Sequence, residues 1–395
     1  MNTKKIVKFG DICQEVKLTT KDPISDGFEY YIGLEHLDSN SLTIKRWGII
    51  RDDNPSFTRV FKKGHILFGK RRSYLKKAAI AKFDGICSSD IIVMEPIGDI
   101  VLHELVPYII QSEPFWDFAI RTSSGSLSPR TKWKDLATYT FNISEQQGHL
   151  LKLFQTMEKT LVASNNLLDA CQQKKKVLMQ NLLTGKVRLL NQNGCRFNHK
   201  WKVLPLSYFV NCIRGVSYKP NDICLVERKD TVRMFRSTNI QNGLLNDQEL
   251  IILPGNLVKE KQLLIDDDLV VCMANGSKSL VGKAAQYVNN GNKYTVGSFC
   301  AIFRPNNHNN KKFLKFLFES SEYSKQLLVI LAGSSINNLK GSNIENMEFY
   351  VPIKYEEQHQ IANILTQVDE EITIIKNKIK SLENIKRNIL LTSFN

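Results

Sequence analysis

The sequence lacks the apolar segments that a membrane protein requires. Hydrophobic residues make up 42% of its 395 positions, and no uninterrupted apolar run approaches the roughly 20 residues of a transmembrane helix. The first residues, Met1–Lys8, are not followed by the apolar core of a signal peptide. We therefore expect a chain that resides in the cytoplasm and has no membrane partner.

Patterns typical of metal sites and disulfide frameworks are also missing. The eight cysteines are scattered without a Cys-x-x-Cys pair, and the seven histidines form no His-x-x-x-His pair. Structural zinc sites and disulfide-stapled folds depend on such spacings. We expect reduced thiols that fill core positions, and no metal bound by this chain.

Two motifs come close to catalytic signatures without completing them. The segment Gly64-x-x-x-x-Gly69-Lys70 begins like a phosphate-binding loop, but Arg71 stands where that loop needs a magnesium-binding Ser or Thr. The segment Asn54-Pro55-Ser56-Phe57 resembles the Asn-Pro-Pro-Phe/Tyr element of amino-methyltransferases, but the second proline is absent and no glycine-rich S-adenosylmethionine loop follows a strand. The sequence therefore predicts no catalytic residue and no cofactor bound by this chain.

Positive charge is in excess. Lysine and arginine total 54 against 39 acidic residues, which gives a net charge of +15. Such an excess indicates a polyanionic partner, and without a lipidation motif a nucleic acid is favoured over a membrane surface. The chain is also longer than a single hydrophobic core usually supports, so two domains are expected.

An internal repeat organises the chain. A shift of 211 residues places Gln147–Leu183 on Gln358–Phe394, and both segments show the 4-3-4-3 apolar spacing of a coiled coil, with Lys175 and Lys386 at corresponding steps. The predicted helix seam comprises Leu150, Phe154, Met157, Leu161, Leu168, Leu178, Ile361, Leu365, Val368, Ile372, Ile375, Ile379, Leu382 and Ile389. A single apolar stripe needs a partner, so we expect the two helices to pack on each other as an antiparallel pair.

Globular segments precede both helices and echo each other. Ile66–Phe68 followed by Lys77–Ala79 parallels Leu269–Val271 followed by Lys283–Ala285. Short β-rich runs alternate with turns and a few helical stretches, which predicts an α+β fold: two globular α/β recognition domains joined by two long antiparallel helices, with an internal pseudo-twofold repeat. The expected ranges are 1–143 for the first domain, 144–186 for the central helix, 187–200 for a linker, 201–354 for the second domain and 355–395 for the C-terminal helix.

The ends of the first helix have their own signals. Ser144-x-x-Gln147 is typical of a capping box, and Gly185 is a typical stop.

Two windows without acidic residues occupy corresponding parts of the repeat. The first runs from Asn54 to Phe83 with nine basic residues, and the second from Leu269 to Phe318 with seven. Surfaces usually mix charges of both signs, so these windows indicate contacts with phosphate groups. The candidate DNA-binding residues are Lys62, Lys63, Lys70, Arg71, Arg72, Tyr74, Lys76, Lys77, Arg130, Lys132, Lys278, Lys283, Lys293, Tyr294 and Lys340.

This organisation resembles the specificity subunit of type I restriction-modification enzymes. The resemblance rests on the helix starts, Ser144–Gln147 and Tyr355–Ile361, and on the helix ends, Lys174–Lys186 and Ile385–Leu390. It implies a non-catalytic subunit that binds double-stranded DNA at a bipartite, asymmetric target, with one half-site for each recognition domain. It further implies two modification subunits and motor-nuclease restriction subunits as partners, which would use S-adenosylmethionine, ATP and magnesium.

Two other functions stay open on the sequence alone. One is a DNA methyltransferase or nuclease whose active site carries no recognisable motif. The other is a coiled-coil scaffold that binds RNA, although few tyrosines for base stacking lie within the basic windows.

Overall fold

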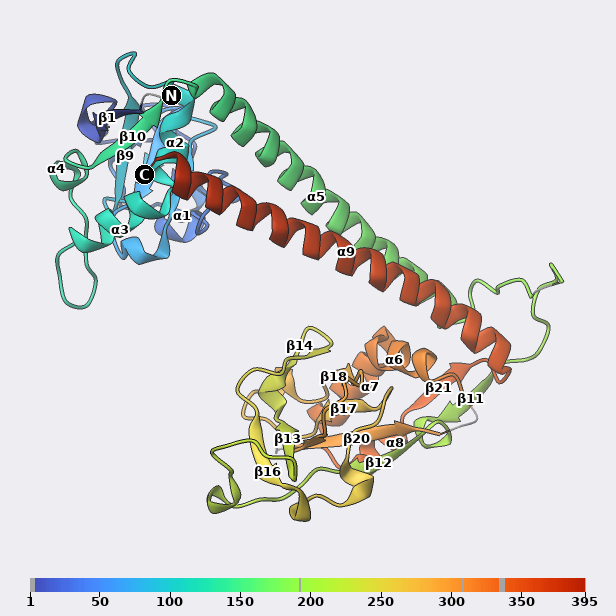
Figure 1. Cartoon of the computed structure of the whole chain (residues 1–395). Coiled ribbons are helices and arrows are strands. Elements are labelled where there is room, and N and C mark those ends of the chain that lie inside the picture. Colours follow the sequence, from blue (N-terminus) through green and yellow to red (C-terminus); the bar gives the residue numbers. More distant parts are fainter. Residues whose placement is uncertain (1–3, 192, 307–308, 334–337, 395) are drawn as a thin grey trace. The chain divides into compact units, whose positions relative to one another are not determined.

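The structure is a computed structural model that describes residues 4–191, 193–306, 309–333 and 338–394. It divides into two compact units. Unit 1 comprises residues 1–166 and 376–395, and unit 2 comprises residues 167–375. The division cuts through the two long helices, α5 (Gln147–Leu182) and α9 (Tyr355–Ser393), so each unit contains a globular part and a portion of both helices (Figure 1).

Unit 1 is built on two four-stranded sheets and a two-stranded ribbon. The central sheet is antiparallel and has the order β2 (Cys13–Val16), β9 (Ile91–Pro96), β6 (Ile66–Gly69) and β7 (Ala78–Ile80). The second sheet has the order β4 (Gly48–Ile49), β3 (Tyr30–Ile32), β8 (Gly85–Cys87) and β5 (Arg59–Phe61), and β3 runs parallel to β8. The ribbon pairs β1 (Lys4–Lys8) with β10 (Thr140–Ser144), and the short helices are α1 (Ile50–Asp53), α2 (Val106–Ile110), α3 (Glu113–Arg121) and α4 (Trp133–Leu136).

The central sheet of unit 1 is covered on both faces. Successive side chains of a strand point to opposite faces, and in β6 Phe68 joins the core beneath α2 and α3 whereas Leu67 joins the core on the side of the second sheet. Phe68 stacks on Trp116 of α3 with the ring centroids 4.9 Å apart. Burial on both faces accounts for the uninterrupted apolar run of β6 and β9.

Unit 2 repeats this architecture. Its central sheet has the order β12 (Val210–Arg214), β20 (Cys300–Pro305), β17 (Leu269–Cys272) and β18 (Ala284–Gln286). Its second sheet has the order β16 (Ile251–Pro254), β13 (Thr231–Phe235) and β19 (Tyr294–Val296), again with one parallel pair, β13 and β19. The ribbon pairs β11 (Lys202–Pro205) with β21 (Glu348–Val351), β14 (Ile240–Gln241) pairs with β15 (Leu244–Leu245), and the helices are α6 (Lys311–Glu319), α7 (Ser321–Ala332) and α8 (Gly341–Glu345).

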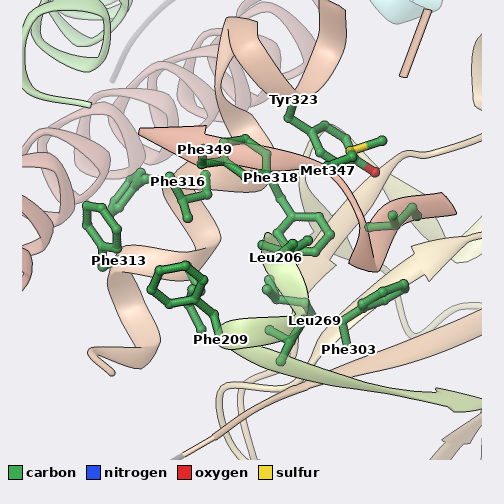
Figure 2. Packing of buried hydrophobic residues seen from close by; sticks show 14 of the residues in the cluster. Leu206, Phe209, Leu269, Phe303, Phe313, Phe316, Phe318, Tyr323, Met347 and Phe349 are labelled. Atoms are coloured by element: carbon green, nitrogen blue, oxygen red, sulfur yellow. The ribbon is translucent and has the colours of Figure 1, made fainter. Parts of the chain in front are cut away.

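Aromatic side chains fill the core between the central sheet and the helices of unit 2. Figure 2 shows Phe313, Phe316 and Phe318 of α6 gathered with Phe209 and Phe303, and all five are buried. Residues from both long helices, including Leu182 and Leu365, belong to the same cluster. The ends of the long helices are thus part of the globular core of unit 2.

The two long helices pack against each other in each unit. In unit 2 the C-terminal part of α5 meets the N-terminal part of α9, where Cys171 packs with Val368 and Ile372. In unit 1 Phe154 of α5 shares the core with Leu390 and Phe394 near the end of the chain. The pairing is antiparallel in both units, and the predicted α+β fold with two long helices and an internal repeat is confirmed.

Every residue of the predicted helix seam is buried or partly buried. Phe154, Met157, Ile361, Leu365, Val368, Ile372 and Ile379 are buried, and Leu150, Leu161, Leu168, Leu178, Ile375, Leu382 and Ile389 are partly buried.

The predicted capping box at the start of α5 is wrong. Ser144 still belongs to β10, where it pairs with Lys4, and its hydroxyl accepts from the backbone N–H of Gln146 at 3.2 Å. The side chain of Gln147 turns away from the helix, donates to the carbonyl of Ile100 at 2.9 Å and accepts from the N–H of Leu102 at 2.8 Å. At the other end the helix stops at Leu182, and Gly185 has the positive φ of 70° that favours glycine after a helix.

Candidate nucleic-acid interface

Two basic segments of unit 1 lie side by side. Residues 70–76 link β6 to β7, and residues 122–132 link α3 to α4 as a loop that projects from the unit in Figure 1. The N–H of Arg72 donates to the carbonyl of Pro129 at 2.8 Å, and the N–H of Thr131 donates to the carbonyl of Lys70 at 2.9 Å. These bonds join segments that are more than fifty positions apart in the sequence. They form one surface, which we call the unit 1 loop pair.

The turn between β6 and β7 has an unusual backbone. Arg72 and Lys76 both adopt the left-handed conformation, with φ of 55° and 50°, on either side of the single turn Ser73–Leu75. Side chains other than glycine pay about 1 kcal/mol or more for this conformation, and such strain is concentrated at functional sites. The turn leaves Tyr74 52% and Leu75 39% exposed.

Asp90 organises the basic side chains of the loop pair. Its carboxylate pairs with Arg71 at 3.3 Å and with Arg130 at 2.9 Å. Burial by itself raises the pKa of Asp90, but the hydrogen bonds and charges of Arg130 and Arg71 outweigh burial and hold the pKa below its usual value. The acid-free window of the sequence therefore contains cations that are paired with acids from outside it: Arg71 with Asp90, Lys76 with Glu113 of α3, and Arg59 with Glu15.

The remaining predicted contact residues of unit 1 differ in their surroundings. Lys62, Lys63, Arg72 and Lys132 are exposed, and within the described part of the chain they form no ion pair. Lys77 is partly buried and donates to the carbonyl of Leu34 at 2.7 Å. Burial, and then the charge of Arg59, lowers the pKa of Lys70. Arg72 and Lys132 are therefore the cations of the loop pair that are available to an external phosphate.

Unit 2 carries a corresponding loop pair. Its turn between β17 and β18 contains the short helix Lys278–Leu280, and Ala274 next to it forms a β-bridge with Asn338, as Arg71 does with Arg130 in unit 1. The predicted contacts Lys278, Lys283, Lys293 and Lys340 are all exposed.

Two aspects of the second window need correction. Tyr294 is only 1% exposed, stacks on Phe235 with a centroid distance of 4.9 Å, and accepts a hydrogen bond from Arg233. It is a core residue, so the prediction that it contacts DNA directly is wrong. Arg304 of the same window is engaged in the interior, where it pairs with the fully buried Asp268 at 2.8 Å.

Sequence reasoning missed the apolar members of the unit 1 loop pair. Leu127 is 91% exposed in the loop between α3 and α4. The only signal in the sequence was its position as the single apolar residue of a Gly- and Ser-rich stretch, Ser123–Pro129. Leu75, which is 39% exposed, was missed as well, because it stands in a segment of lysines and arginines.

Ion pairs join the long helices to their neighbours. In unit 2 Lys175 lies between Asp369 at 2.6 Å and Glu319 at 2.5 Å, and Lys315 also binds Asp369. In unit 1 Lys386 binds Glu158 at 2.5 Å. The basic residues that coincide in the repeat thus make interhelical contacts in both units.

Within the described ranges, no group of three His, Cys, Asp or Glu side chains is placed to hold a metal ion. Among those residues, no helix has both the length and the apolar content of a membrane span.

Known proteins resemble this chain in sequence and in fold. The family model described as Type I restriction modification DNA specificity domain matches residues 198–384. The EcoKI specificity subunit of the type I restriction enzyme of Escherichia coli K12 is 33% identical over 172 residues, which are 43% of this chain and 37% of that protein. The StySPI specificity subunit of Salmonella potsdam is 30% identical over 193 residues, 48% of this chain and 42% of that protein. The matched region thus spans less than half the length of either relative.

Solved structures share the fold over the whole chain. The type I restriction-modification S subunit of M. genitalium aligns with a TM-score of 0.61 and 12% identity, covering 100% of this chain and 96% of that one. A chain from a structure described as the basis of complex assembly and conformational transition of the type I R-M system aligns with a TM-score of 0.57 and 16% identity, covering 98% and 96%. The second half of this chain thus matches the DNA specificity domain of type I restriction-modification systems, and the chain is similar in sequence to specificity subunits of that type and shares its fold with solved S subunits.

Proposed function

We propose that this chain is the non-catalytic subunit that selects the DNA sequence for a type I restriction-modification complex. In this role it binds a bipartite, asymmetric target in double-stranded DNA, and each unit reads one half-site. The supporting observation is the duplicated architecture: both units present a basic loop pair at the equivalent turn of the same sheet topology. Because the loop pairs differ in sequence, the half-sites should differ as well.

The charge distribution favours duplex DNA as the ligand. Arg72 and Lys132 in unit 1, and Lys278 and Lys283 in unit 2, are exposed on or beside the loop pairs. Exposed cations on two separate modules suit phosphate contacts on two stretches of one duplex. Base edges would then be read by neighbouring side chains such as Asn338.

The helices have two proposed roles. At 1.5 Å per residue, α5 with its 36 residues is about 54 Å long and can act as a ruler between half-sites. Their outer faces would dock two methyltransferase subunits, and restriction subunits would join that assembly. In this proposal the partner subunits bind S-adenosylmethionine, ATP and magnesium, the chain itself binds no cofactor, and the complex works in the cytoplasm.

Methylation mapping in the host tests the proposal. Deleting the gene for this chain should abolish adenine methylation at one bipartite motif in the genome, and expressing the chain again should restore it. The proposal would be contradicted if the deletion left methylation unchanged at every motif. It would also be contradicted if the purified chain, given S-adenosylmethionine alone, methylated DNA.

A further inference from the structure

Leu127 is an exposed apolar side chain in a charged setting. It is 91% exposed at the tip of the loop between Ser124 and Arg130. Isolated apolar residues on a protein surface are common and need no explanation by themselves. Leu127 differs from such residues in three respects: the base of its loop is fixed by hydrogen bonds, the surface around it is basic, and other exposed apolar side chains lie on the same loop pair.

The base of the loop is held by hydrogen bonds on both strands. Ser124 and Arg130 exchange two backbone hydrogen bonds of 3.0 and 2.9 Å, and Arg71 donates to the hydroxyl of Ser128 at 3.2 Å. Below them the hydroxyl of Thr131 is buried and lies 2.6 Å from that of Ser73. The five residues between Ser124 and Arg130 are therefore carried on a fixed base, with Leu127 in the middle of them.

The surface around the tip attracts polyanions. Neither residues 70–76 nor residues 123–132 contain an acid. Of their cations, Arg71 and Arg130 bind Asp90, Lys76 binds Glu113 and Lys70 is partly buried, whereas Arg72 and Lys132 are exposed and form no ion pair with the described residues. The left-handed turn presents Tyr74 and Leu75 on the same loop pair. The loop pair thus combines exposed apolar side chains with exposed cations, which suits a duplex made of apolar base stacks and charged phosphates.

We infer that Leu127 inserts partly between two adjacent base pairs of the target and bends the duplex there. This inference rests on the proposed function. Leucine is among the side chains that DNA-bending proteins use as wedges, and the cost of unstacking is offset by contacts that the bent duplex gains. Arg72 and Lys132 hold the phosphates on either side of the opened step. The wedge favours sequences with an easily unstacked step at this position, so it adds specificity without a hydrogen bond to a base.

The test compares variants of the full chain bound to a duplex with the target found by methylation mapping, and to an unrelated duplex. End-labelled DNA reports the bend by energy transfer, and titration reports affinity. Leu127→Ala should bind the target about tenfold more weakly and bend it less, while binding to the unrelated duplex is unchanged. Leu127→Phe keeps a wedge and should retain both properties. Leu102→Ala, the same change at a residue 41% exposed in unit 1, is the matched control.

The outcomes separate the wedge from other roles of the loop. Wild-type affinity and bend for Leu127→Ala would overturn the inference and leave the proposed function intact. Normal DNA binding with lost assembly of the modification subunits would also overturn it, because the tip would then contact protein. If the wild-type chain, alone and with its modification subunits, prefers no target over the unrelated duplex, the proposed function fails together with the wedge.

Discussion

Lys175 of α5 binds Asp369 of α9 at 2.6 Å, and the same relationship recurs 211 residues along the chain with the partners exchanged. There Lys386 of α9 binds Glu158 of α5 at 2.5 Å. Each contact lies within one unit, so each unit carries its own interhelical ion pair. The repeat places a lysine at the same position of both helices, and an acid at another shared position. When the helices pack antiparallel, each lysine therefore meets the acid of the other helix, and two equivalent ion pairs form.

Removing Lys175 should destabilise unit 2. In Lys175→Met the partly buried acids Glu319 and Asp369 retain, among the described residues, one cation, Lys315. Breaking a partly buried ion pair of this kind should cost about 2–4 kcal/mol of the free energy of unfolding. The control Lys174→Met loses only a pair with Glu371 in which both side chains are about half exposed, so it should cost less than about 1 kcal/mol. Urea denaturation followed by circular dichroism measures the free energy of unfolding of both variants. Equal effects of the two variants would contradict the role of Lys175.

The contribution of Asp369 should depend on pH. Burial raises its pKa, but the hydrogen bonds from Lys175 and Lys315 outweigh burial and bring the pKa below the ordinary value of 3.8. A carboxyl group with a lowered pKa in the folded state stabilises the fold above its unfolded pKa and loses this effect as the pH falls through the folded value. Asp369→Asn should thus be less stable than wild type at about pH 7, and the difference should shrink below about pH 4. A difference that grows on acidification would refute this linkage, and Glu371→Gln is the exposed control.

Periodicity in the sequence was sufficient to predict the long helices, because a coiled-coil seam is a local pattern. The seam residue Phe154 is fully buried, as its spacing indicated. The repeat also aligned Gln147 with Gln358, but the hydrogen bonds that these side chains form involve residues outside the helix-start pattern. Gln147 binds the backbone at Ile100 and Leu102, and Gln358 binds the backbone at Pro352 and Asn310. Both glutamines tie a long helix to its globular part, which no helix-start pattern reveals.

The basic windows were a poorer guide, since a linear window omits acids that folding brings near. Asp90 lies outside the first window, yet it holds Arg71 and Arg130 together. Tyr294 lies among basic residues in the sequence, but β19 places it in the core. The sequence showed where basic residues are concentrated. The fold was needed to tell the cations that pair with acids of the protein from those that can bind an external phosphate.

Arg72 should contact phosphate in every duplex that the chain binds. It is exposed on the strained turn, and Arg72→Ala should weaken binding to target and unrelated DNA alike. The dependence of log affinity on log salt should become shallower by about 0.9 for each lost phosphate contact. Lys278→Ala is the corresponding change in unit 2 and should act in the same way. Arg46→Ala, which removes a cation already bound to Asp38, should leave the salt dependence unchanged. An unaltered slope for Arg72→Ala would remove this residue from the interface.

Exchanging the first globular part should change one half-site. The junction belongs just before Gln147, because β1 pairs with β10 as far as Ser144 and both strands must come from the same protein. The retained Gln147 binds only backbone atoms, so a foreign segment can satisfy it. A chimera with residues 1–146 of another specificity subunit should acquire that protein's half-site and keep its own second one. Methylation mapping reads the result, and a change in both half-sites would show that the units do not divide the recognition task.

The length of the helix pair should set the gap between half-sites. Glu158 contacts Lys386 in an antiparallel pair, so residues near Leu382 lie opposite Leu161. Inserting four residues after Leu161 and four after Leu382 adds about one turn, or roughly 6 Å, to both helices and nearly preserves the phase of the seam. At about 3.4 Å per base pair, the preferred gap should grow by one or two pairs while both half-sites keep their sequences. The control inserts two residues at each place, which turns the seam residues away from the partner helix and should abolish methylation. Methylation mapping in cells with the partner subunits distinguishes these results, and an active four-residue variant with the original gap would show that the helices are not the ruler.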